Sequence, residues 1–185
     1  MNPSTCERES GWVTVDGEKY YLSSSTGVLV TNQWIDDNHY VGEDGSLIPD
    51  YQNGVSFRWP LSSGYSYISS YFGNRESPGG VGSTNHKGID IGASGGAAIV
   101  AAADGTVTTA AYSSAAGNYV MIDHGGGLYT VYMHASALLV FAWTDGSAGQ
   151  TIAQVGSTGI STGNHLHFGV SLNGSYVSPW SYLGR

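Results

Sequence analysis

Basic residues are scarce in this sequence. Its 185 residues include only six lysines and arginines against 14 aspartates and glutamates, and the formal net charge is −8. A protein that binds a phosphate backbone needs clustered lysine and arginine, whereas the six basic residues here are scattered. We therefore expect neither nucleic acid nor an anionic membrane surface as a partner.

Cysteine pairs, long apolar runs and an N-terminal targeting pattern are missing as well. The single cysteine, Cys6, excludes an internal disulfide and is interpreted as an incidental residue of the tail. The longest apolar run, about residues 137–143, is far shorter than the roughly 20 residues that span a bilayer, so no transmembrane segment is expected. No basic segment followed by an apolar one opens the chain, which predicts no signal peptide within it.

What the sequence does contain is apolar residues and glycine. Hydrophobic residues make up 41% and charged residues 11%, a balance that supports a sizeable core and excludes a disordered chain. The 28 glycines show no collagen period and are typical of turns and bulges. Short apolar segments between glycine-rich turns, with no sustained period of 3.6, predict a mainly β protein with antiparallel sheets. Hairpins are expected at 99–110 around Asp104-Gly105, at 119–133 around the glycines 125–127, and at 165–177 around Asn173-Gly174.

A degenerate repeat occupies residues 11–48. Trp12 and Trp34 lie 22 positions apart, and each precedes a turn, an aromatic residue and a glycine. A period near 20 predicts one short β-hairpin per repeat, and such hairpins stack into arrays. The aromatic side chains either form a small core or line pockets for a sugar or a quaternary amine. The candidate binding residues are Trp12, Tyr20, Tyr21, Trp34 and Tyr40.

This repeat resembles the choline-binding and glucan-binding repeats of bacterial surface proteins. The resemblance implies a cell-wall glycan or a choline-type ligand. The sequence then divides into a tail (1–10), a hairpin repeat module (11–48), a polar linker (49–56) and a second domain (57–185).

Five of the six histidines lie in the second domain, where Glu76 is the only glutamate. A reactive site there must therefore be built from histidine, with or without an aspartate. In a strand, His165 and His167 point to the face opposite Leu166 and Phe168, which supply the core. Two such imidazoles share a metal, or one binds the metal while the other stands beside it. The His-x-His pattern alone is weak evidence.

His86 and Asp90 form the second part of a candidate site. In a straight strand they would lie roughly 13 Å apart, too far to share one ion, so the backbone must bend at Gly88. Together with one histidine of the 165/167 pair they would supply three ligands, and zinc with three protein ligands keeps a fourth position for water. His134 ends the predicted 128–133 strand, where alternation groups it with Thr130 and Tyr132, off the apolar face that Val131 and Met133 share.

From about residue 57 onward the sequence resembles the lysostaphin-like zinc endopeptidases that cut peptidoglycan cross-bridges. The motifs that carry the resemblance are Ser70-Tyr71-Phe72-Gly73-Asn74-Arg75, His86-Lys87-Gly88-Ile89-Asp90-Ile91, residues 102–107, residues 129–134 and residues 156–168. The resemblance implies that His86, Asp90 and His167 hold one zinc ion. It implies further that His134 and His165 act on the attacking water and the developing oxyanion, in an order that stays open.

Some residues depart from this family pattern. Asn164 replaces the usual proline before the His-x-His motif, and Gly169 replaces a glutamate or glutamine after it. Residues 140–145 replace the usual Gly-Asp-x-Val turn. These changes leave the ligands intact, and we expect them to alter the shape of the groove and hence the substrate preference. His124, at a hairpin corner, is expected to be structural, and His39 is expected on the surface of a repeat.

The expected function is zinc-dependent hydrolysis of stem or cross-bridge peptides in bacterial peptidoglycan. The expected location is outside the cell or in the cell wall, in a protein of bacterial or phage lytic origin. One alternative is a non-catalytic relative of the same fold that binds peptidoglycan or activates another hydrolase. A second alternative is a carbohydrate-binding protein whose histidines are incidental.

Overall fold

The computed structural model describes residues 9–15, 17–31, 33–36, 39–42, 44–48, 57–62, 64–77, 80 and 82–183. Two compact units, Met1–Gly54 and Val55–Arg185, divide the chain. The predicted linker 49–56, most of the predicted tail and Cys6 lie outside the described residues. In the described part, no helix is long and apolar enough to cross a membrane.

The N-terminal unit consists of short antiparallel strands, as the repeat predicts. β1 (Gly11–Val15) pairs with β2 (Glu18–Leu22) across a turn in which Gly17 has a φ of 92°. β3 (Gln33–Asp36), β4 (His39–Val41) and β5 (Leu47–Ile48) form a three-stranded sheet. An isolated bridge between Tyr20 and Ser46 joins the first hairpin to the β4–β5 turn. The predicted hairpin module is therefore confirmed, with a third strand added to the second repeat.

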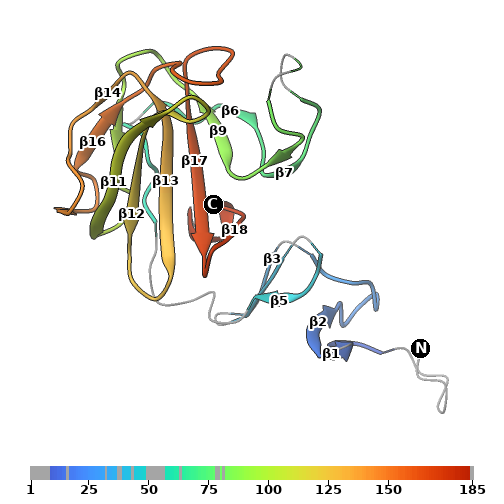
Figure 1. Ribbon diagram of the computed structural model, residues 1–185. Helices are drawn as coiled ribbons and strands as arrows, with labels where there is room; N and C mark the ends of the chain where they lie inside the picture. The colour runs from blue at the N-terminus through green and yellow to red at the C-terminus, as the bar shows by residue number, and fades with distance from the viewer. Residues whose placement is uncertain are drawn as a thin grey trace. The chain divides into compact units, whose positions relative to one another are not determined.

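An eight-stranded antiparallel sheet forms the larger unit (Figure 1). Its order is β15-β11-β12-β13-β17-β9-β6, and β18 also pairs with β17. The strands are β6 (Ile68–Ser70), β9 (Ile89–Gly92), β11 (Gly105–Ser113), β12 (Gly117–Asp123), β13 (Leu128–Ala135), β15 (Thr144–Gly146), β17 (His165–Leu172) and β18 (Ser175–Val177). This arrangement confirms the predicted mainly β, antiparallel fold class.

Two smaller sheets and one short helix complete the unit. β10 (Ala98–Val100), β16 (Thr151–Gln154) and β14 (Ala137–Leu138) form a three-stranded sheet. β7 (Gly73–Asn74) pairs with β8 (Asn85–His86), and α1 (Trp180–Leu183) lies near the end of the chain.

Two of the three predicted hairpins are confirmed, namely β12–β13 and β17–β18. At the second turn Asn173 and Gly174 both have positive φ, 50° and 83°, which matches the tight two-residue turn expected of Asn-Gly. The hairpin predicted at 99–110 is wrong, because β10 pairs with β16 while β11 pairs with β12 and β15. Asp104 instead forms a hydrogen bond with a residue distant in sequence, because its Oδ1 accepts from the Ala148 N–H at 2.7 Å.

The core follows the alternation of β17. Leu166, Phe168 and Val170 are fully buried, as predicted. The Phe168 ring lies 5.4 Å from the ring of Tyr132 and 6.5 Å from that of Phe57. Each such side chain contributes about 1.5–3 kcal/mol when it is buried. The opposite face of β17 is thereby left for polar residues.

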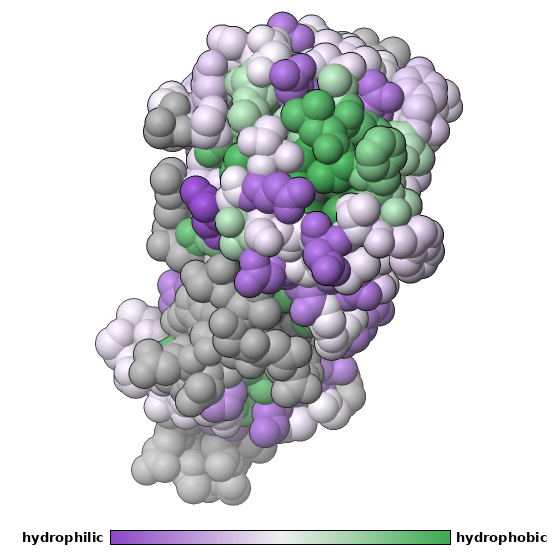
Figure 2. All heavy atoms as spheres, turned by 90° about the vertical axis from the view of Figure 1, so that its left-hand side faces the viewer, coloured by the Kyte–Doolittle hydropathy of each residue, from purple (hydrophilic) through white to green (hydrophobic). Residues whose placement is uncertain are grey.

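The departure at residues 140–145 produces an exposed apolar segment. Val140 is buried, whereas Leu139, Phe141 and Trp143 are exposed, and Trp143 has a φ of 67°. Figure 2 shows the side of the molecule that carries β14 and β16, where apolar residues gather in the upper part. The Trp143 N–H donates to the Val107 carbonyl at 2.6 Å and leads the chain into β15.

Candidate metal centre

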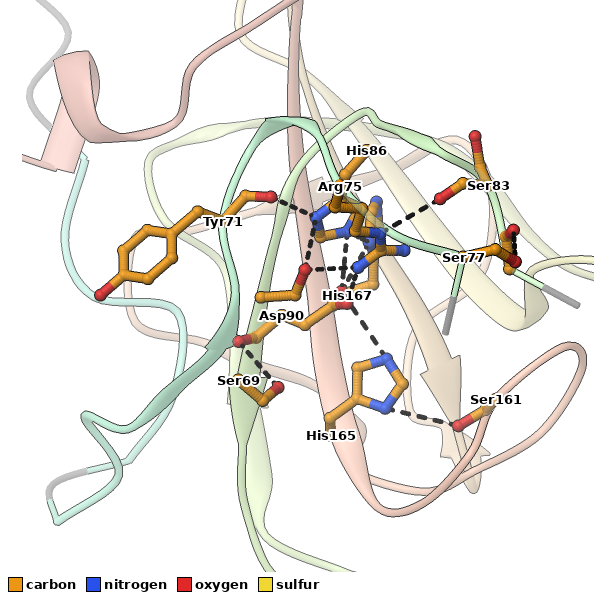
Figure 3. A network of polar contacts seen from close by, with 12 residues as sticks. Ser69, Tyr71, Arg75, Ser77, Ser83, His86, Asp90, Ser161, His165 and His167 are labelled. Carbon is orange, nitrogen blue, oxygen red and sulfur yellow. Dashed lines mark hydrogen bonds and ion pairs between the residues drawn. The ribbon is translucent and has the colours of Figure 1, made fainter. Parts of the chain in front are cut away.

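Three side chains from three strands converge in the second unit (Figure 3). His86 ends β8, Asp90 lies in β9, and His167 lies opposite Asp90 in β17. The Asp90 Oδ1 lies 3.0 Å from the His86 Nε2 and 2.9 Å from the His167 Nδ1, and the two nitrogens are 3.0 Å apart. All three residues are buried. The structure therefore brings together the three residues predicted as ligands.

The backbone bends at Lys87 and Gly88, as predicted, and the space around Gly88 gives a second reason for glycine there. The φ of Gly88 is not among the positive values, so no left-handed backbone demands glycine. A Cβ at this position would lie 2.8 Å from the His167 Nε2 and would overlap the Phe168 carbonyl oxygen. Glycine is therefore needed for space, because β9 and the His167 ring approach each other closely.

Outer contacts orient two of the ligands. The His86 Nδ1 lies 2.7 Å from the Tyr71 carbonyl, which only accepts, so Nδ1 carries the proton and the Nε2 lone pair points inward. The Asp90 Oδ2 accepts from the Arg75 Nη1 at 2.8 Å, which leaves Oδ1 for the centre. Arg75 is a residue that sequence reasoning did not single out, although it belongs to the Ser70–Arg75 motif.

The three donor atoms fit a zinc ion. Two imidazole nitrogens and one carboxylate oxygen are ligands that zinc prefers, and three protein ligands leave one position open. Burial lowers the pKa of His167, which favours the neutral form that binds metal. Burial acts to raise the pKa of Asp90, but the imidazoles of His167 and His86 outweigh it and hold that pKa well below its usual range.

His165 lies beside the three ligands. Its Nδ1 is 2.8 Å from the Gly163 carbonyl, and its Nε2 is 3.7 Å from the Asp90 Oδ1. Because a carbonyl only accepts, the proton of the neutral ring sits on Nδ1 and the Nε2 lone pair faces the centre. The structure thus places His165 next to the ligand set, and the hydrogen bond to the Gly163 carbonyl fixes the orientation of its ring.

The His134 side chain also lies beside the ligand set, and its backbone has a positive φ of 66°. Its Nδ1 lies 2.8 Å from the Thr158 carbonyl, and its ring centroid lies 4.8 Å from that of His165. Burial lowers the pKa of His134 to about 4, so the ring is neutral near pH 7. As in His165, the proton of the neutral ring sits on Nδ1, which faces a carbonyl, and Nε2 carries the lone pair.

His134 faces the pocket and not the apolar core, as predicted, but the prediction that Tyr132 shares its face is wrong. Tyr132 pairs with Phe168 and is fully buried in the core, where its hydroxyl accepts from the Ala102 N–H at 2.8 Å. Strict alternation would send His134 into the core as well. A φ of 66° at His134 turns its side chain toward the centre instead, a strained conformation that costs about 1–3 kcal/mol for a residue other than glycine.

A pocket of about 440 Å³ opens over the three ligands. Besides the four histidines and Asp90, its lining includes Arg75, Lys87, Met133, Ile160, Ser161 and Thr162. Met133 lies directly opposite His167 on the neighbouring strand. The pocket therefore places the ligand set, both further imidazoles and two cationic side chains on one accessible surface.

The remaining predicted residues lie elsewhere. Trp12 is paired with Tyr21, with ring centroids 5.1 Å apart, and its ring also lies 5.2 Å from the partly buried His39. Trp34 is paired with Tyr40 through the backbone, and their side chains lie outside the described part. Tyr20 is partly buried in β2. Ligand binding by these five residues stays a prediction.

His124 lies at the β12–β13 corner, outside the pocket. Its Nδ1 donates to the Asp104 carbonyl at 2.6 Å, and its Nε2 lies 2.8 Å from the Thr130 hydroxyl. Both ring nitrogens are thus engaged with the protein itself, as a structural role requires.

An antiparallel β domain with a His–Asp–His set and two further imidazoles has the architecture of a metallopeptidase. Residues 84–179 match the model of peptidase family M23, and residues 8–46 match the choline-binding repeat. The chain therefore belongs to peptidase family M23, and choline-binding repeats precede its peptidase domain.

Curated relatives support this membership. An uncharacterized metalloprotease of Haemophilus influenzae is 44% identical over 123 residues, 66% of this chain and 26% of the relative. The DD-carboxypeptidase/endopeptidase Mpg of Neisseria meningitidis is 40% identical over 141 residues, 75% of this chain and 31% of the relative. The murein hydrolase activator NlpD of Escherichia coli is 38% identical over 129 residues, 69% of this chain and 31% of the relative. The chain thus spans about a quarter to a third of the length of these relatives.

Solved structures share the fold. A zinc-containing peptidase from Vibrio cholerae superposes with a TM-score of 0.62 at 31% identity, covering 76% of this chain and 44% of that one. The catalytic domain of lysostaphin from Staphylococcus simulans gives a TM-score of 0.58 at 29% identity, covering 64% of this chain and 92% of that one. The resemblance to lysostaphin-like enzymes expected from the motifs is therefore confirmed.

Proposed function

We propose that this protein is a zinc-dependent endopeptidase that hydrolyses peptide cross-links of bacterial peptidoglycan. The observation that carries the proposal is the meeting of His86, Asp90 and His167 with two oriented imidazoles in one pocket. The similarity to the DD-carboxypeptidase/endopeptidase and to lysostaphin supports this class of substrate.

One zinc ion per chain, held by His86, Asp90 and His167, would supply a lowered water pKa and a polarised peptide carbonyl. His165 and His134 accept a proton at Nε2 when neutral and donate one there when protonated. In this mechanism one of them takes the proton of the attacking water. The proton received at this Nε2 then passes to the leaving amine. The other ring faces the developing oxyanion, and it would donate an Nε2–H to it only in its protonated form, since the neutral ring carries its proton on Nδ1.

The same proposal assigns the repeats to targeting. Trp12, Tyr20, Tyr21, Trp34 and Tyr40 would bind a choline-type ligand or wall glycan by cation–π contact or stacking. A positively charged quaternary amine suits a chain with a net charge of −8. The protein then acts at the bacterial cell wall. The proposed division is a tail at 1–10, repeats at 11–48, a linker at 49–56 and a peptidase domain at 57–185.

A test of targeting removes residues 1–50. We expect hydrolysis of small soluble peptides to continue while binding to choline-containing cell walls falls. Free choline should compete with the full chain and leave the shortened one unaffected. Equal binding of both chains to sacculi would assign the aromatic residues a structural role only.

The alternative is a non-catalytic relative that activates another hydrolase, a role named for the similar NlpD. Digestion of purified, cross-linked muropeptides separates the two functions. An endopeptidase releases uncross-linked fragments whose masses identify the cleaved bond, loses this activity with a chelator and regains it with zinc. An activator releases nothing alone but accelerates a partner hydrolase with or without the chelator.

A further inference from the structure

Arg75 connects the ligand set to the chain segments around it. Its Nη1 donates to the Asp90 Oδ2 at 2.8 Å and to the Ser70 hydroxyl at 2.5 Å, while its Nε donates to the Ser83 carbonyl at 3.2 Å. The side chain is only 19% exposed. One guanidinium therefore holds β6, the segment before β8, and Asp90 in a fixed arrangement.

The two oxygens of Asp90 have different partners. Oδ1 faces the imidazoles of His86 and His167, whereas Oδ2 is held by Arg75 (Figure 3). A carboxylate whose second oxygen is unpaired can rotate or bind a metal through both oxygens. The ion pair with Arg75 fixes the plane of the carboxylate. It therefore prevents this rotation and keeps Oδ2 from binding a metal together with Oδ1.

We propose that Arg75 is a positioning residue that fixes Asp90 as a ligand through one oxygen and thereby preorganises the zinc site. The inference rests on the zinc site of the proposed function and deepens it. Partners of this kind contribute about 10–100-fold to metal affinity. Lysine cannot substitute, because a single ammonium cannot reach from Ser83 to Asp90 and Ser70 with the geometry of the guanidinium fork.

Charge and positioning predict opposite effects when Arg75 is removed. A positive charge beside a divalent cation repels it, so the loss of that charge alone would strengthen zinc binding. The loss of a positioning contact weakens zinc binding instead. The direction of the change in affinity therefore identifies the role.

The experiment measures zinc affinity of the full chain by competition with a chromogenic chelator. We expect Arg75→Met to bind zinc 10–100-fold more weakly than the wild type, and Arg75→Lys to be weakened as well. In the cobalt-substituted protein, the visible absorption should change as Asp90 turns toward binding through both oxygens. Arg58→Met is the matched control, since it removes an arginine outside the pocket, and it should bind zinc like the wild type.

Unchanged or tighter zinc binding by Arg75→Met would overturn the positioning role, as would full affinity in Arg75→Lys. If Arg75→Met fails to fold without metal, Arg75→Lys decides, because it keeps the positive charge but lacks the guanidinium fork. If the wild-type protein itself fails to bind zinc, the proposed function is overturned instead. The affinity measurement keeps these two failures apart, because it does not depend on hydrolysis.

Discussion

Asp90 and His167 are direct partners across the antiparallel strands β9 and β17, and the Asp90 Oδ1 lies 2.9 Å from the His167 Nδ1. A shift of one residue in this register would turn one of the two side chains into the core. The pairing of β9 with β17 therefore also assembles two of the three proposed ligands. Metal binding and the stability of these central strands should consequently depend on each other.

The first prediction concerns this dependence. We expect zinc to raise the free energy of unfolding by about 2.7 kcal/mol when free zinc exceeds its dissociation constant 100-fold. Thermal unfolding of metal-free protein, with and without zinc, measures the effect. Magnesium serves as the control ion, because it prefers oxygen ligands and should leave the midpoint unchanged. Equal stabilisation by magnesium would contradict a site of this composition.

The second prediction uses the close approach at Gly88. Gly88→Ala places a Cβ against the Phe168 carbonyl and the His167 ring, and the backbone oxygen cannot rotate away. Overpacking of this kind costs about 1–3 kcal/mol and should displace His167, so both the unfolding midpoint and zinc affinity should fall. In Gly163→Ala the new Cβ meets no atom within 4 Å, and the midpoint should be unaffected. A wild-type midpoint in Gly88→Ala would show that the strands adjust freely.

Much of the fold and of the candidate site can be predicted from local sequence patterns. The alternation of β17 predicts which face carries His165 and His167, and Asn173-Gly174 predicts the turn that follows. The pairing of β10 with β16 could not be predicted from the sequence. The two strands lie about 50 residues apart, and no local pattern such as a turn motif indicates that they pair. The left-handed backbone of His134 escapes detection as well, since it depends on the Ala116 carbonyl and Thr158 rather than on neighbouring residues.

The third prediction concerns His124 and pH. Burial lowers the pKa of His124, against the opposing influence of Asp104 and Asp123. A lowered pKa in the folded state means that the unfolded state binds the proton more readily. The contribution of this histidine to stability is therefore complete above about pH 6.5 and is lost as the pH falls toward the folded pKa.

Urea unfolding at several pH values, with His124→Gln as the comparison, tests this direction. At pH 7.5 the variant should be less stable by about 1 kcal/mol, because the ring's hydrogen bonds to the Asp104 carbonyl and the Thr130 hydroxyl are lost. The difference should shrink between pH 6.5 and pH 5. A difference that grows on acidification would mean that protonated His124 is the stabilising form.

The last prediction separates the histidines of the centre. His167→Ala leaves two of the three proposed ligands, so zinc affinity and turnover should fall together. His165→Ala leaves all three, so zinc should stay bound while turnover drops about 10²–10⁴-fold, the usual contribution of a positioned acid or base. For the third variant His134→Asn is preferable to alanine, because asparagine tolerates the left-handed backbone at φ 66°. It should resemble His165→Ala, with zinc retained and turnover lost.

Zinc stoichiometry by elemental analysis, measured beside turnover on a defined cross-linked muropeptide, distinguishes these outcomes. Thermal unfolding of each variant serves as the control for folding. A metal-free but folded His165→Ala would place that imidazole among the ligands, since its Nε2 already lies 3.7 Å from the Asp90 Oδ1. In that case the division of roles between His165 and His167 would be wrong, and the ligand set would have to be redrawn to include His165.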